Sequence, residues 1–561
     1  MRRPLPALAV VLSLVAASVV TWAGLAARSD GPRAIGRVDG DELVDFSLVL
    51  AQDERAIARH FARGAAPLSP ATFGERFGLD DAALGRVTAS ARVAGFEVVS
   101  TYPQRTALRL RGTAAEIEAY FGTPLLEFAH PSGRTYRAPE RPVAPPAELR
   151  PFVTAIAGLD TAALPSFSAA SPALSAPASV LPDIPPDGLT PEQAATAYGI
   201  TPLYEEGFTG QGETIALYSA ATFDPADVER FDELFGIESP PVERIPVNGG
   251  TEDRTGPLAG EVALDIDVIR GLAPGAQILN YEVAITSIDS FAQSIADVVD
   301  QVVADGRAKV LSISYGITDT PDHCGQSWLT PEDRLRGEQA LEAAAAAGVA
   351  IFVSSGDQGA YATQHFDQGC VRETVTWPGS SSWVTSVGGT LLSVASDGAY
   401  LEEAGWEDIL WHWATGGGNS PVDARPAWQV APGVDNAASN GNRQVPDVAA
   451  TGDPDSGPMT VFQGQINRSG GTSASAPFWA ASWLLIGQYL KANGVSTPGF
   501  ANPTLYELAS TPQPFPPYHD VVRGGNRLHN CTPGWDYATG LGSPDVWNIA
   551  RDLVAAATPP T

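Results

Sequence analysis

Cysteine is scarce in this sequence, with three residues among 561. There is no Cys-x-x-Cys pair and no Cys/His cluster with zinc spacing, which argues against a zinc or redox site. A chain of this length has enough core to fold without a dense disulfide framework. We expect one disulfide bridge, between Cys324 and Cys370, which leaves Cys531 without a partner. The alternative is that Cys324 and Cys370 are two free buried thiols.

Apolar runs long enough to span a bilayer are absent after residue 27. Before it, Arg2 and Arg3 precede an apolar run with small residues near its end. This order of positive, apolar and small residues is typical of a secretory signal. We therefore expect residues 1–27 to export the protein to the outside of the cell; a retained membrane anchor is the alternative.

Basic charge is also in short supply, since 34 Lys and Arg stand against 64 Asp and Glu, for a net charge of −30. Nucleic acid and anionic membranes are therefore not expected partners. Residues 31–165 hold 15 Arg against 16 acidic residues, so the excess negative charge lies after residue 165. The two parts attract each other only while the carboxylates are ionised. This pattern favours an inhibitory prosegment released by acid; two domains with different surfaces are the alternative.

Hydrophobic periodicity divides the chain into a small domain, a linker and a large body. Residues 40–160 predict a compact α+β domain. Its expected elements are a strand at 46–50, a helix at 54–63, strands at 96–102 and 107–111, and a helix at 113–119. Thr113 and Glu116 match a capping box at the start of the last helix.

Residues 161–188 are mainly Ala, Ser and Pro, a composition that disfavours regular structure. An exposed, extended segment is what a protease cuts, so this stretch is interpreted as an activation linker. Residues 189–555 alternate strands and helices, which predicts a parallel sheet with helices on both faces. The expected strands are 213–218, 277–281, 310–314 and 349–354, and the expected helices include 291–305 and 334–347.

A candidate nucleophile lies in the segment Gly-Gly-Thr-Ser-Ala-Ser-Ala-Pro, at Ser473. The preceding glycines permit close approach of a substrate, and a helix start offers free N–H groups to a developing negative charge. Gly-Thr-Ser-x-x-x-Pro resembles the nucleophile signature of subtilisin-like peptidases. A serine nucleophile usually needs a histidine base, but none of the seven histidines has the His-Gly-Thr setting of subtilisins.

Two carboxyl groups offer a substitute for the histidine. Glu261 and Asp265 are four residues apart in a predicted helix and so share a face among apolar neighbours. If they share a proton, Glu261 becomes a usable base in acid, where a histidine would be protonated. Asp267 lies on a different face. An exposed acidic helix face is the alternative.

A third acid, Asp357, follows the predicted strand at 349–354 in a glycine-flanked turn. A protonated Asp there could donate a hydrogen bond to an oxyanion, a role that requires the neutral acid. Taken alone this signal is weak, because Asp is common in turns.

Together these segments resemble the sedolisins, or serine-carboxyl peptidases, including kumamolisin-like enzymes and tripeptidyl peptidases. The matching motifs are Gly-Glu-Val-Ala-Leu-Asp at 260–265, Ser-Ser-Gly-Asp at 354–357 and Gly-Thr-Ser at 471–473. Residues 45–160 look like that family's activation domain. The resemblance implies a subtilisin-like α/β sandwich and a self-processing zymogen that hydrolyses protein or peptide substrates in acid, as an endopeptidase or a tripeptidyl peptidase. It also implies inhibition by the prodomain, and we expect a monomer after processing.

By this resemblance, Ser473 attacks the scissile carbonyl, Glu261 takes its proton and Asp265 orients Glu261. Asp357 then stabilises the oxyanion of an acyl-enzyme pathway. The resemblance further implies one structural Ca²⁺ ion near the C-terminus. Its ligands would be the side chains of Asp520 and Asp536 and the carbonyl groups of Val521, Thr532 and Gly534. Thr532 departs from the family's usual Gly, and ordinary Asp/Gly turns are the alternative.

Two other classes of function remain open. The first is an inactive subtilisin-fold binding protein, against which the presence of all four catalytic candidates counts. The second is a neutral subtilisin-type or esterase-type hydrolase that uses an unrecognised histidine. The dependence of activity on pH separates them from an acid peptidase.

Overall fold

A computed structural model describes residues 33–129, 135–162, 188–285, 291–319, 329–362, 372–408 and 413–557. The expected signal at 1–27, nearly all of the linker, and the proposed partners Cys324 and Cys370 lie outside these residues. Cys531 is a free, buried thiol. In the described part, no helix is both long enough and apolar enough to traverse a bilayer.

The front domain is an open-faced α+β unit with an antiparallel four-stranded sheet in the order β3-β4-β2-β7. A second sheet has the order β1-β5-β6. Its elements are β1 (Ala34–Arg37), β2 (Leu43–Leu50), α1 (Glu54–Ala62), α2 (Pro70–Phe77), α3 (Asp81–Val93), β3 (Glu97–Thr101), β4 (Ala107–Thr113), α4 (Ala114–Phe121), β5 (Leu125–Ala129), β6 (Thr135–Pro139) and β7 (Val153–Ala157). The predicted capping box of Thr113 and Glu116 is confirmed at the start of α4. Helices α2 and α3 and strands β1 and β5 to β7 were not predicted.

The large domain is built on an eight-stranded sheet in the order β16-β15-β13-β11-β8-β10-β9, with β21 also paired to β15. All of these pairs are parallel except β15 with β16. The strands are β8 (Thr214–Ser219), β9 (Glu243–Pro246), β10 (Gln277–Glu282), β11 (Val310–Ile313), β13 (Ala350–Ser354), β15 (Thr385–Val394), β16 (Tyr400–Gly405) and β21 (Val448–Thr451). The four strands expected from the sequence are therefore neighbours at the centre of the sheet.

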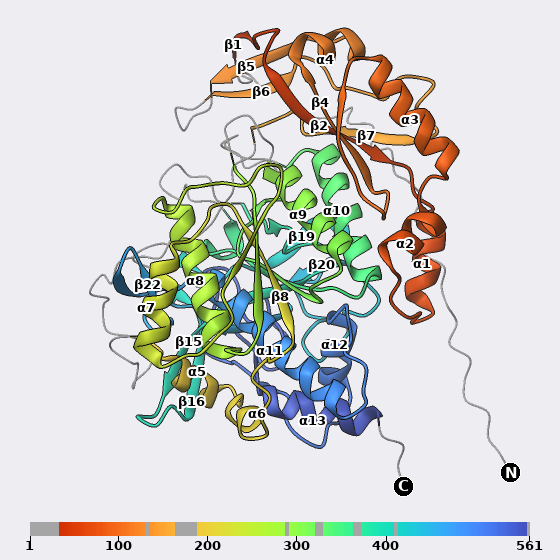
Figure 1. The fold of residues 1–561 in the computed structure, drawn as a ribbon. Coiled ribbons are helices and arrows are strands. Elements are labelled where there is room, and N and C mark those ends of the chain that lie inside the picture. Colours follow the sequence, from red (N-terminus) through yellow and green to blue (C-terminus); the bar gives the residue numbers. More distant parts are fainter. Residues whose placement is uncertain are drawn as a thin grey trace, which may run out of the picture.

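Helices cover both faces of this sheet, as predicted (Figure 1). Alternate strand residues point to opposite faces, so Ile215 and Leu217 pack on the side of α8 and α11, and Ala216 and Tyr218 on the side of α9 and α10. The helices are α5 (Pro191–Ala197), α6 (Thr201–Glu205), α7 (Pro225–Phe235), α8 (Pro257–Leu272), α9 (Phe291–Asp305), α10 (Pro331–Ala346), α11 (Thr472–Ala492), α12 (Asn502–Ser510) and α13 (Val546–Ala557).

Short elements fill the loops around the sheet. They are β12 (Ile317–Thr318), η1 (Gly359–Tyr361), β14 (Thr376–Trp377), β17 (Glu407–Asp408), β18 (Trp413–Ala414), β19 (Gly418–Ala424), β20 (Asn442–Val445), β22 (Met459–Phe462), β23 (Gln465–Arg468), β24 (Tyr518–His519) and β25 (Ser543–Pro544). Together with the central sheet and its two helical layers, they complete the predicted subtilisin-like α/β fold.

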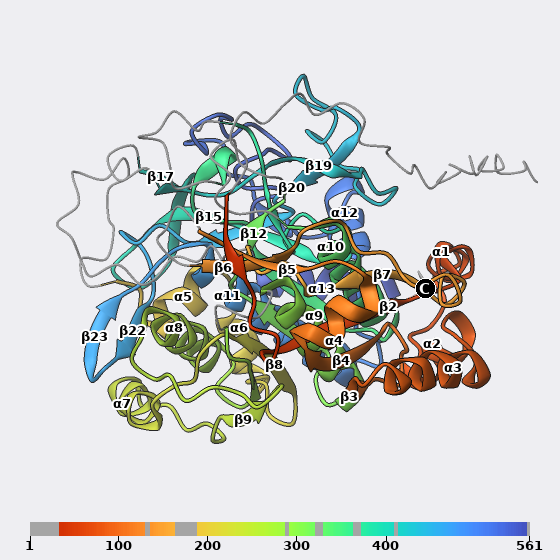
Figure 2. The ribbon, with the colours of Figure 1, turned by 90° about the horizontal axis from the view of Figure 1, so that it is seen from above.

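The front domain docks on the outer surfaces of α9 and α10 (Figures 1 and 2). Phe73 and Phe77 pack against Ala343 and Ala346 of α10 in one apolar cluster. A polar cluster lies beside it, where Arg109 of β4 forms a buried ion pair with Asp297 of α9. The interface therefore combines apolar packing with buried opposite charges.

A second polar contact reaches Asp300 of α9 from the loop before β4. The side chains of Gln104 and Thr106 both donate to this carboxylate, at 2.8 Å in each case. Arg336 of α10 contacts Asp300 at 2.6 Å and Asp297 at 3.2 Å. The two aspartates therefore have a basic partner within the large domain as well as partners in the front domain.

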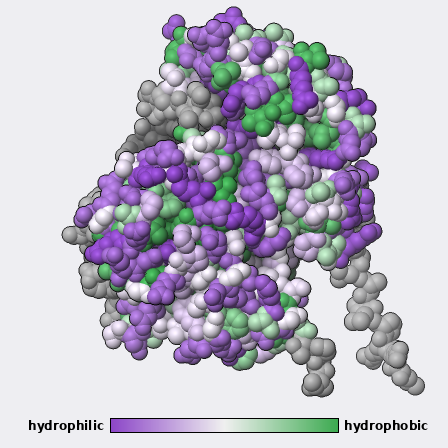
Figure 3. Space-filling model, in the orientation of Figure 1, coloured by the Kyte–Doolittle hydropathy of each residue, from purple (hydrophilic) through white to green (hydrophobic). Residues whose placement is uncertain are grey.

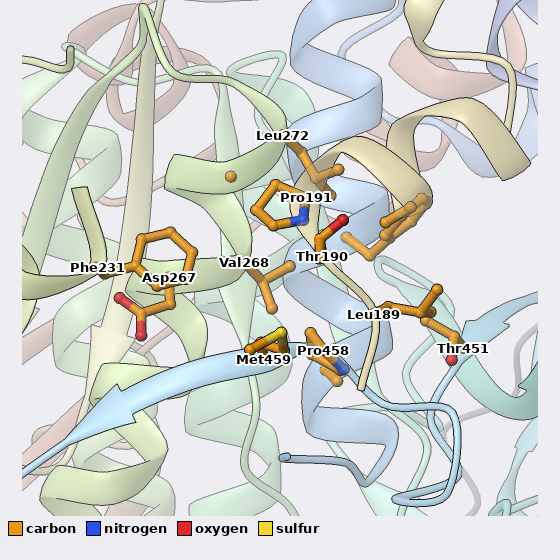
Figure 4. Close-up of a pocket in the computed structure, with 14 residues that line it drawn as sticks. Leu189, Thr190, Pro191, Phe231, Asp267, Val268, Leu272, Thr451, Pro458 and Met459 are labelled. Carbon is orange, nitrogen blue, oxygen red and sulfur yellow. The ribbon is translucent and has the colours of Figure 1, made fainter. Parts of the chain in front are cut away.

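The described part of the large domain begins at an anchor, Leu189, whose backbone forms two hydrogen bonds. The Leu189 amide donates to the Gly457 carbonyl at 2.9 Å, and the Met459 amide donates to the Leu189 carbonyl at 2.9 Å. Leu189 and Pro191 also line a small apolar pocket together with Val268 of α8 (Figure 4). The chain is thus held in place as soon as it leaves the predicted linker.

Candidate active site

Ser473 is the second residue of α11, whose N-terminus lies at the carboxyl ends of the central strands. Gly471 precedes the helix with φ of 90°, a left-handed conformation that favours glycine. The Ser473 side chain is buried, and its hydroxyl donates to the Ser314 carbonyl oxygen at 3.4 Å. The glycine-rich segment therefore places Ser473 at the edge of the sheet where substrates bind in such folds.

Glu261 and Asp265 lie on successive turns of α8, which packs directly against α11. Both carboxyl groups are fully buried. Burial raises the pKa of Glu261 well above its ordinary value, and Asp265 and Asp357 raise it further. The Ser473 hydroxyl interacts with Glu261 and opposes this rise, although its geometry does not form a regular hydrogen bond with either Glu261 oxygen. The helix face is thus buried, so the alternative of an exposed acidic face is wrong.

Asp265 is tied to the strand that ends beside it. The Ser314 hydroxyl, just after β11, donates to Asp265 Oδ1 at 2.6 Å. Burial raises the pKa of Asp265 well above its ordinary value, and this hydrogen bond opposes the rise. Sequence reasoning missed Ser314; its position at the carboxyl end of a central strand was the available signal.

Asp357 lies in the turn after β13, as predicted, and points to the start of α11. Its Oδ1 accepts hydrogen bonds from the Thr472 amide at 2.7 Å and the Thr472 hydroxyl at 2.8 Å. Burial raises the pKa of Asp357 to about 6, and the two bonds from Thr472 oppose the rise. Thr472 therefore fixes Asp357 one residue from the candidate nucleophile, a contact that the sequence did not reveal.

No Lys, Arg or His of the described ranges forms an ion pair with Glu261, Asp265 or Asp357. Three histidines lie in these ranges, and each has other surroundings. His60 is in the front domain, His519 stacks on Tyr400, and His529 lies 3.4 Å from Glu373. The other four lie outside the described residues. The described site thus consists of a serine hydroxyl and three carboxyl groups.

Asp267 is separate from this group, as its helical position predicted. Its Oδ2 accepts a hydrogen bond from the Val461 amide at 2.8 Å. Figure 4 shows its side chain beside Phe231, in the apolar pocket that Val268 also lines. Burial raises the pKa of Asp267 well above its ordinary value, and the hydrogen bond from Val461 opposes the rise.

Four of the five predicted Ca²⁺ ligands contact one another in pairs near the C-terminus. The Gly534 amide donates to both oxygens of Asp520 at 3.1 Å, and the Thr532 amide donates to Asp536 Oδ2 at 3.0 Å. Asp536 is 3% exposed, and no basic side chain of the described residues pairs with either aspartate. Two carboxylates and three carbonyl groups are hard oxygen donors that suit Ca²⁺. The residues therefore fit the ion in type, although the described chain has no cluster of three acidic or histidine ligands.

Comparison with known proteins identifies the family. The chain is 33% identical to kumamolisin of Bacillus sp. (strain MN-32), over 95% of this chain and 96% of that protein. The chain belongs to the sedolisin family of serine-carboxyl peptidases. It is also 29% identical to sedolisin of Pseudomonas sp. (strain 101), over 85% of this chain and 80% of that protein. This peptidase matches the description "Subtilase family" at residues 249–500 and "Pro-kumamolisin, activation domain" at residues 31–162.

A solved structure supports the same conclusion about the fold. Pseudomonas sedolisin, a serine-carboxyl proteinase complexed with two molecules of pseudo-iodotyrostatin, superposes with a TM-score of 0.55. It is 26% identical and covers 67% of this chain and all of that one. The predicted family, the fold and the activity class of a serine-type peptidase are therefore confirmed. The front domain is an activation domain that inhibits this serine-carboxyl peptidase in its zymogen form.

Proposed function

We propose that this zymogen is a secreted peptidase that works in acid through Ser473, Glu261, Asp265 and Asp357. Ser473 Oγ attacks the scissile carbonyl carbon while Glu261 accepts the hydroxyl proton. The proton then passes from Glu261 to the leaving amine, which leaves an acyl-enzyme. Water hydrolyses the acyl-enzyme by the same steps, with Glu261 again accepting a proton.

One proton shared between Glu261 and Asp265 makes this chemistry possible. Two carboxylates buried side by side without a basic partner resist carrying two negative charges, so one remains protonated over a wide pH range. Ser314 donates to Asp265 and holds that carboxyl in a fixed orientation. Glu261, whose oxygens have no other hydrogen-bond partner, is then free to receive the proton of Ser473.

Asp357 acts in the same proposal as the donor to the oxyanion. Thr472 occupies one carboxyl oxygen of Asp357, which leaves the other for the substrate. Below a pH of about 6 this second oxygen carries a proton and can donate it in a hydrogen bond. Ionisation at higher pH would place a negative charge beside the developing oxyanion and oppose the reaction.

The observation that carries the proposal is the pair of fully buried carboxyl groups facing Ser473 without a histidine or other base in the described site. Its test is peptide hydrolysis across pH by the wild type and by Ser473→Ala, Glu261→Gln, His519→Gln and His529→Gln. We expect an acidic maximum, no activity in the first two variants, and unchanged activity in the two histidine variants. A maximum near neutrality, or activity that survives Glu261→Gln and fails in a histidine variant, would overturn the carboxyl mechanism.

Acid has opposing effects on the carboxyl groups of the zymogen interface. Arg109 pairs with Asp297 in a buried position, and this attraction is lost when the aspartate is protonated. Two other carboxyl groups act in the opposite sense. Burial raises the pKa of Asp160, near α10, to about 7. Burial, and then repulsion from Glu338 and Glu54, raises the pKa of Glu342 to about 8. Protonation of Asp160 and Glu342 in acid makes docking more favourable.

Because these effects oppose each other, we propose that cutting of the linker is the decisive step. Acid switches on the catalytic carboxyl groups, the linker is cut, and the prodomain then dissociates because it is no longer held at a high effective concentration. At about pH 4, where the carboxyl mechanism operates, the wild type should lose its prodomain and Ser473→Ala should keep it. Identical behaviour of the two proteins would contradict self-processing.

The remaining expectations are proposals of the same kind. Residues 1–27 would direct secretion, which N-terminal sequencing of exported protein would test. The processed enzyme would be a monomer, which its sedimentation would test. Asp520 and Asp536, with the carbonyl groups of Val521, Thr532 and Gly534, would hold a structural Ca²⁺ ion that stabilises the C-terminal loop.

A further inference from the structure

A cavity of about 260 Å³ lies in the prodomain, where the C-terminal ends of α1 and α2 meet. Its charged and polar lining consists of Arg59, His60, Arg63 and Arg76, and the rest is Phe77 and two alanines. No Asp or Glu lines it. Figure 3 shows hydrophilic side chains along the edge of the molecule where these helices lie. The lining of the cavity is therefore positively charged.

These basic groups have no acidic partner in the described part of the chain. None of Arg59, Arg63 and Arg76 forms an ion pair or a side-chain hydrogen bond there, although the protein has 64 acidic residues. His60 is 5% exposed, and its Nδ1 is buried without a hydrogen bond. Arg59, Arg63 and Arg76 are exposed to solvent, so of the four polar lining residues only His60 is buried. The cavity thus combines three exposed guanidinium groups that no acidic side chain of the described residues engages with one buried ring nitrogen that has no hydrogen bond.

Complementing the helix dipoles does not account for this much charge. A helix C-terminus carries about half a negative charge, so the two ends together supply about −1. Three guanidinium groups supply about +3, which leaves an excess of about +2 around the cavity. An anion with two negative charges would match that excess, and a monovalent carboxylate would match half of it.

We propose that this cavity binds a tetrahedral oxyanion, phosphate or sulfate, either free or as an ester on a larger molecule. Guanidinium groups bind such oxygens in pairs, and His60 offers a further ring nitrogen. The volume exceeds that of one oxyanion, so the site accepts an ester as well. The binding itself does not depend on the peptidase function.

Binding here would reinforce the zymogen, and this consequence rests on the proposed function. Helices α1 and α2 pack on α10 through Phe73 and Phe77, and Phe77 also lines the cavity. The whole lining belongs to the prodomain, so a bound ligand stabilises by mass action the folded arrangement of α1 and α2 that packs on α10. Phosphate should therefore slow self-processing.

The test is calorimetric titration of full-length Ser473→Ala, which keeps its prodomain, with sodium phosphate, sodium sulfate, glycerol 2-phosphate and sodium acetate at constant ionic strength. We expect one saturable site per chain with a dissociation constant on the order of 1 mM for phosphate. Sulfate should bind comparably and acetate at least tenfold more weakly. Binding of glycerol 2-phosphate would identify an open site for esters, and its failure beside phosphate binding would identify a site for the free ion.

The matched variants are Arg59→Gln with Arg63→Gln in the cavity, and Arg92→Gln in the last turn of α3 as the control. We expect the cavity pair to lose at least tenfold in phosphate affinity and the control to lose none. Circular dichroism confirms that each variant is folded. Absence of saturable binding, equal loss in the pair and the control, or equal affinity for acetate would each overturn the proposal. In the active enzyme, unchanged processing despite phosphate binding would refute only the link to activation.

Discussion

Replacing Asp357 by asparagine should stabilise the protein at neutral pH and not in acid. In the folded state, burial raises the pKa of Asp357 to about 6 from an ordinary value of 3.8. One pKa unit corresponds to about 1.4 kcal/mol, so ionising the buried carboxyl costs about 3 kcal/mol of folding free energy. The folded state binds the proton more tightly, and stability therefore rises as pH falls from about 6 to 3.8.

Asparagine removes this cost and keeps the local hydrogen bonds, since its carbonyl oxygen can still accept from Thr472. The assay is urea unfolding of full-length Ser473→Ala with and without Asp357→Asn, at several pH values. The gain should approach about 3 kcal/mol at pH 7 and vanish near pH 4. Asp397→Asn, at an exposed turn of the same domain, is the control and should show no such dependence.

Two results would refute this reasoning. Equal stabilisation at both pH values would mean that ionisation is not the cause, and no stabilisation at pH 7 would mean that the buried carboxyl is already well solvated. Measurements of peptidase activity test the role of Asp357 independently of stability. Asp357→Ala should lower kcat by about 10²-fold to 10³-fold, as loss of an oxyanion donor does. Asp357→Asn should retain more activity and move the decline above pH 6 to higher pH.

Three further predictions concern the proton acceptor, the zymogen interface and the metal loop. Ser314→Ala removes the donor to Asp265, so it should lower kcat with little change in KM and shift the acidic limb of the pH profile; a change in KM alone would contradict a role in positioning Asp265. Arg109→Met leaves Asp297 with Arg336 but removes the bond between domains, so hydrogen exchange at α9 in full-length Ser473→Ala should show opening at least tenfold more often, with Arg92→Gln unchanged. Excess chelator should lower the melting temperature of the wild type and have no effect on Asp536→Asn; equal shifts, or none, would refute the Ca²⁺ site.

The sequence predicted the centre of the fold because its strands are continuous apolar runs between amphipathic helices. It also indicated Glu261 and Asp265, since a spacing of four places two residues on one helix face. It missed Ser314 and the contacts of Thr472, because a small hydroxyl residue at a strand or helix end has no distinctive pattern. Helices α2 and α3 were missed although Ser69 and Asp80 cap them.

The prodomain interface shows a different limit of sequence reasoning. An arginine-rich, nearly neutral part before a strongly acidic part predicted attraction between the two, and the ion pair of Arg109 with Asp297 is one such contact. The raised pKa values of Asp160 and Glu342 depend on burial by residues far away in the sequence, which charge counting does not include. Whether a carboxyl group strengthens or weakens docking in acid is decided by its surroundings.

The anchor at Leu189 has a consequence for the mature N-terminus. Wherever the linker is first cut, peptidases can trim the new N-terminal segment only as far as residues whose backbone is hydrogen-bonded to another part of the chain. The amide and carbonyl groups of Leu189 are both engaged, with Gly457 and Met459. Molecules first cut at different positions in the linker would therefore be trimmed to the same N-terminal residue, just before Leu189. The mature enzyme would then have one N-terminus even if the first cleavage position varied.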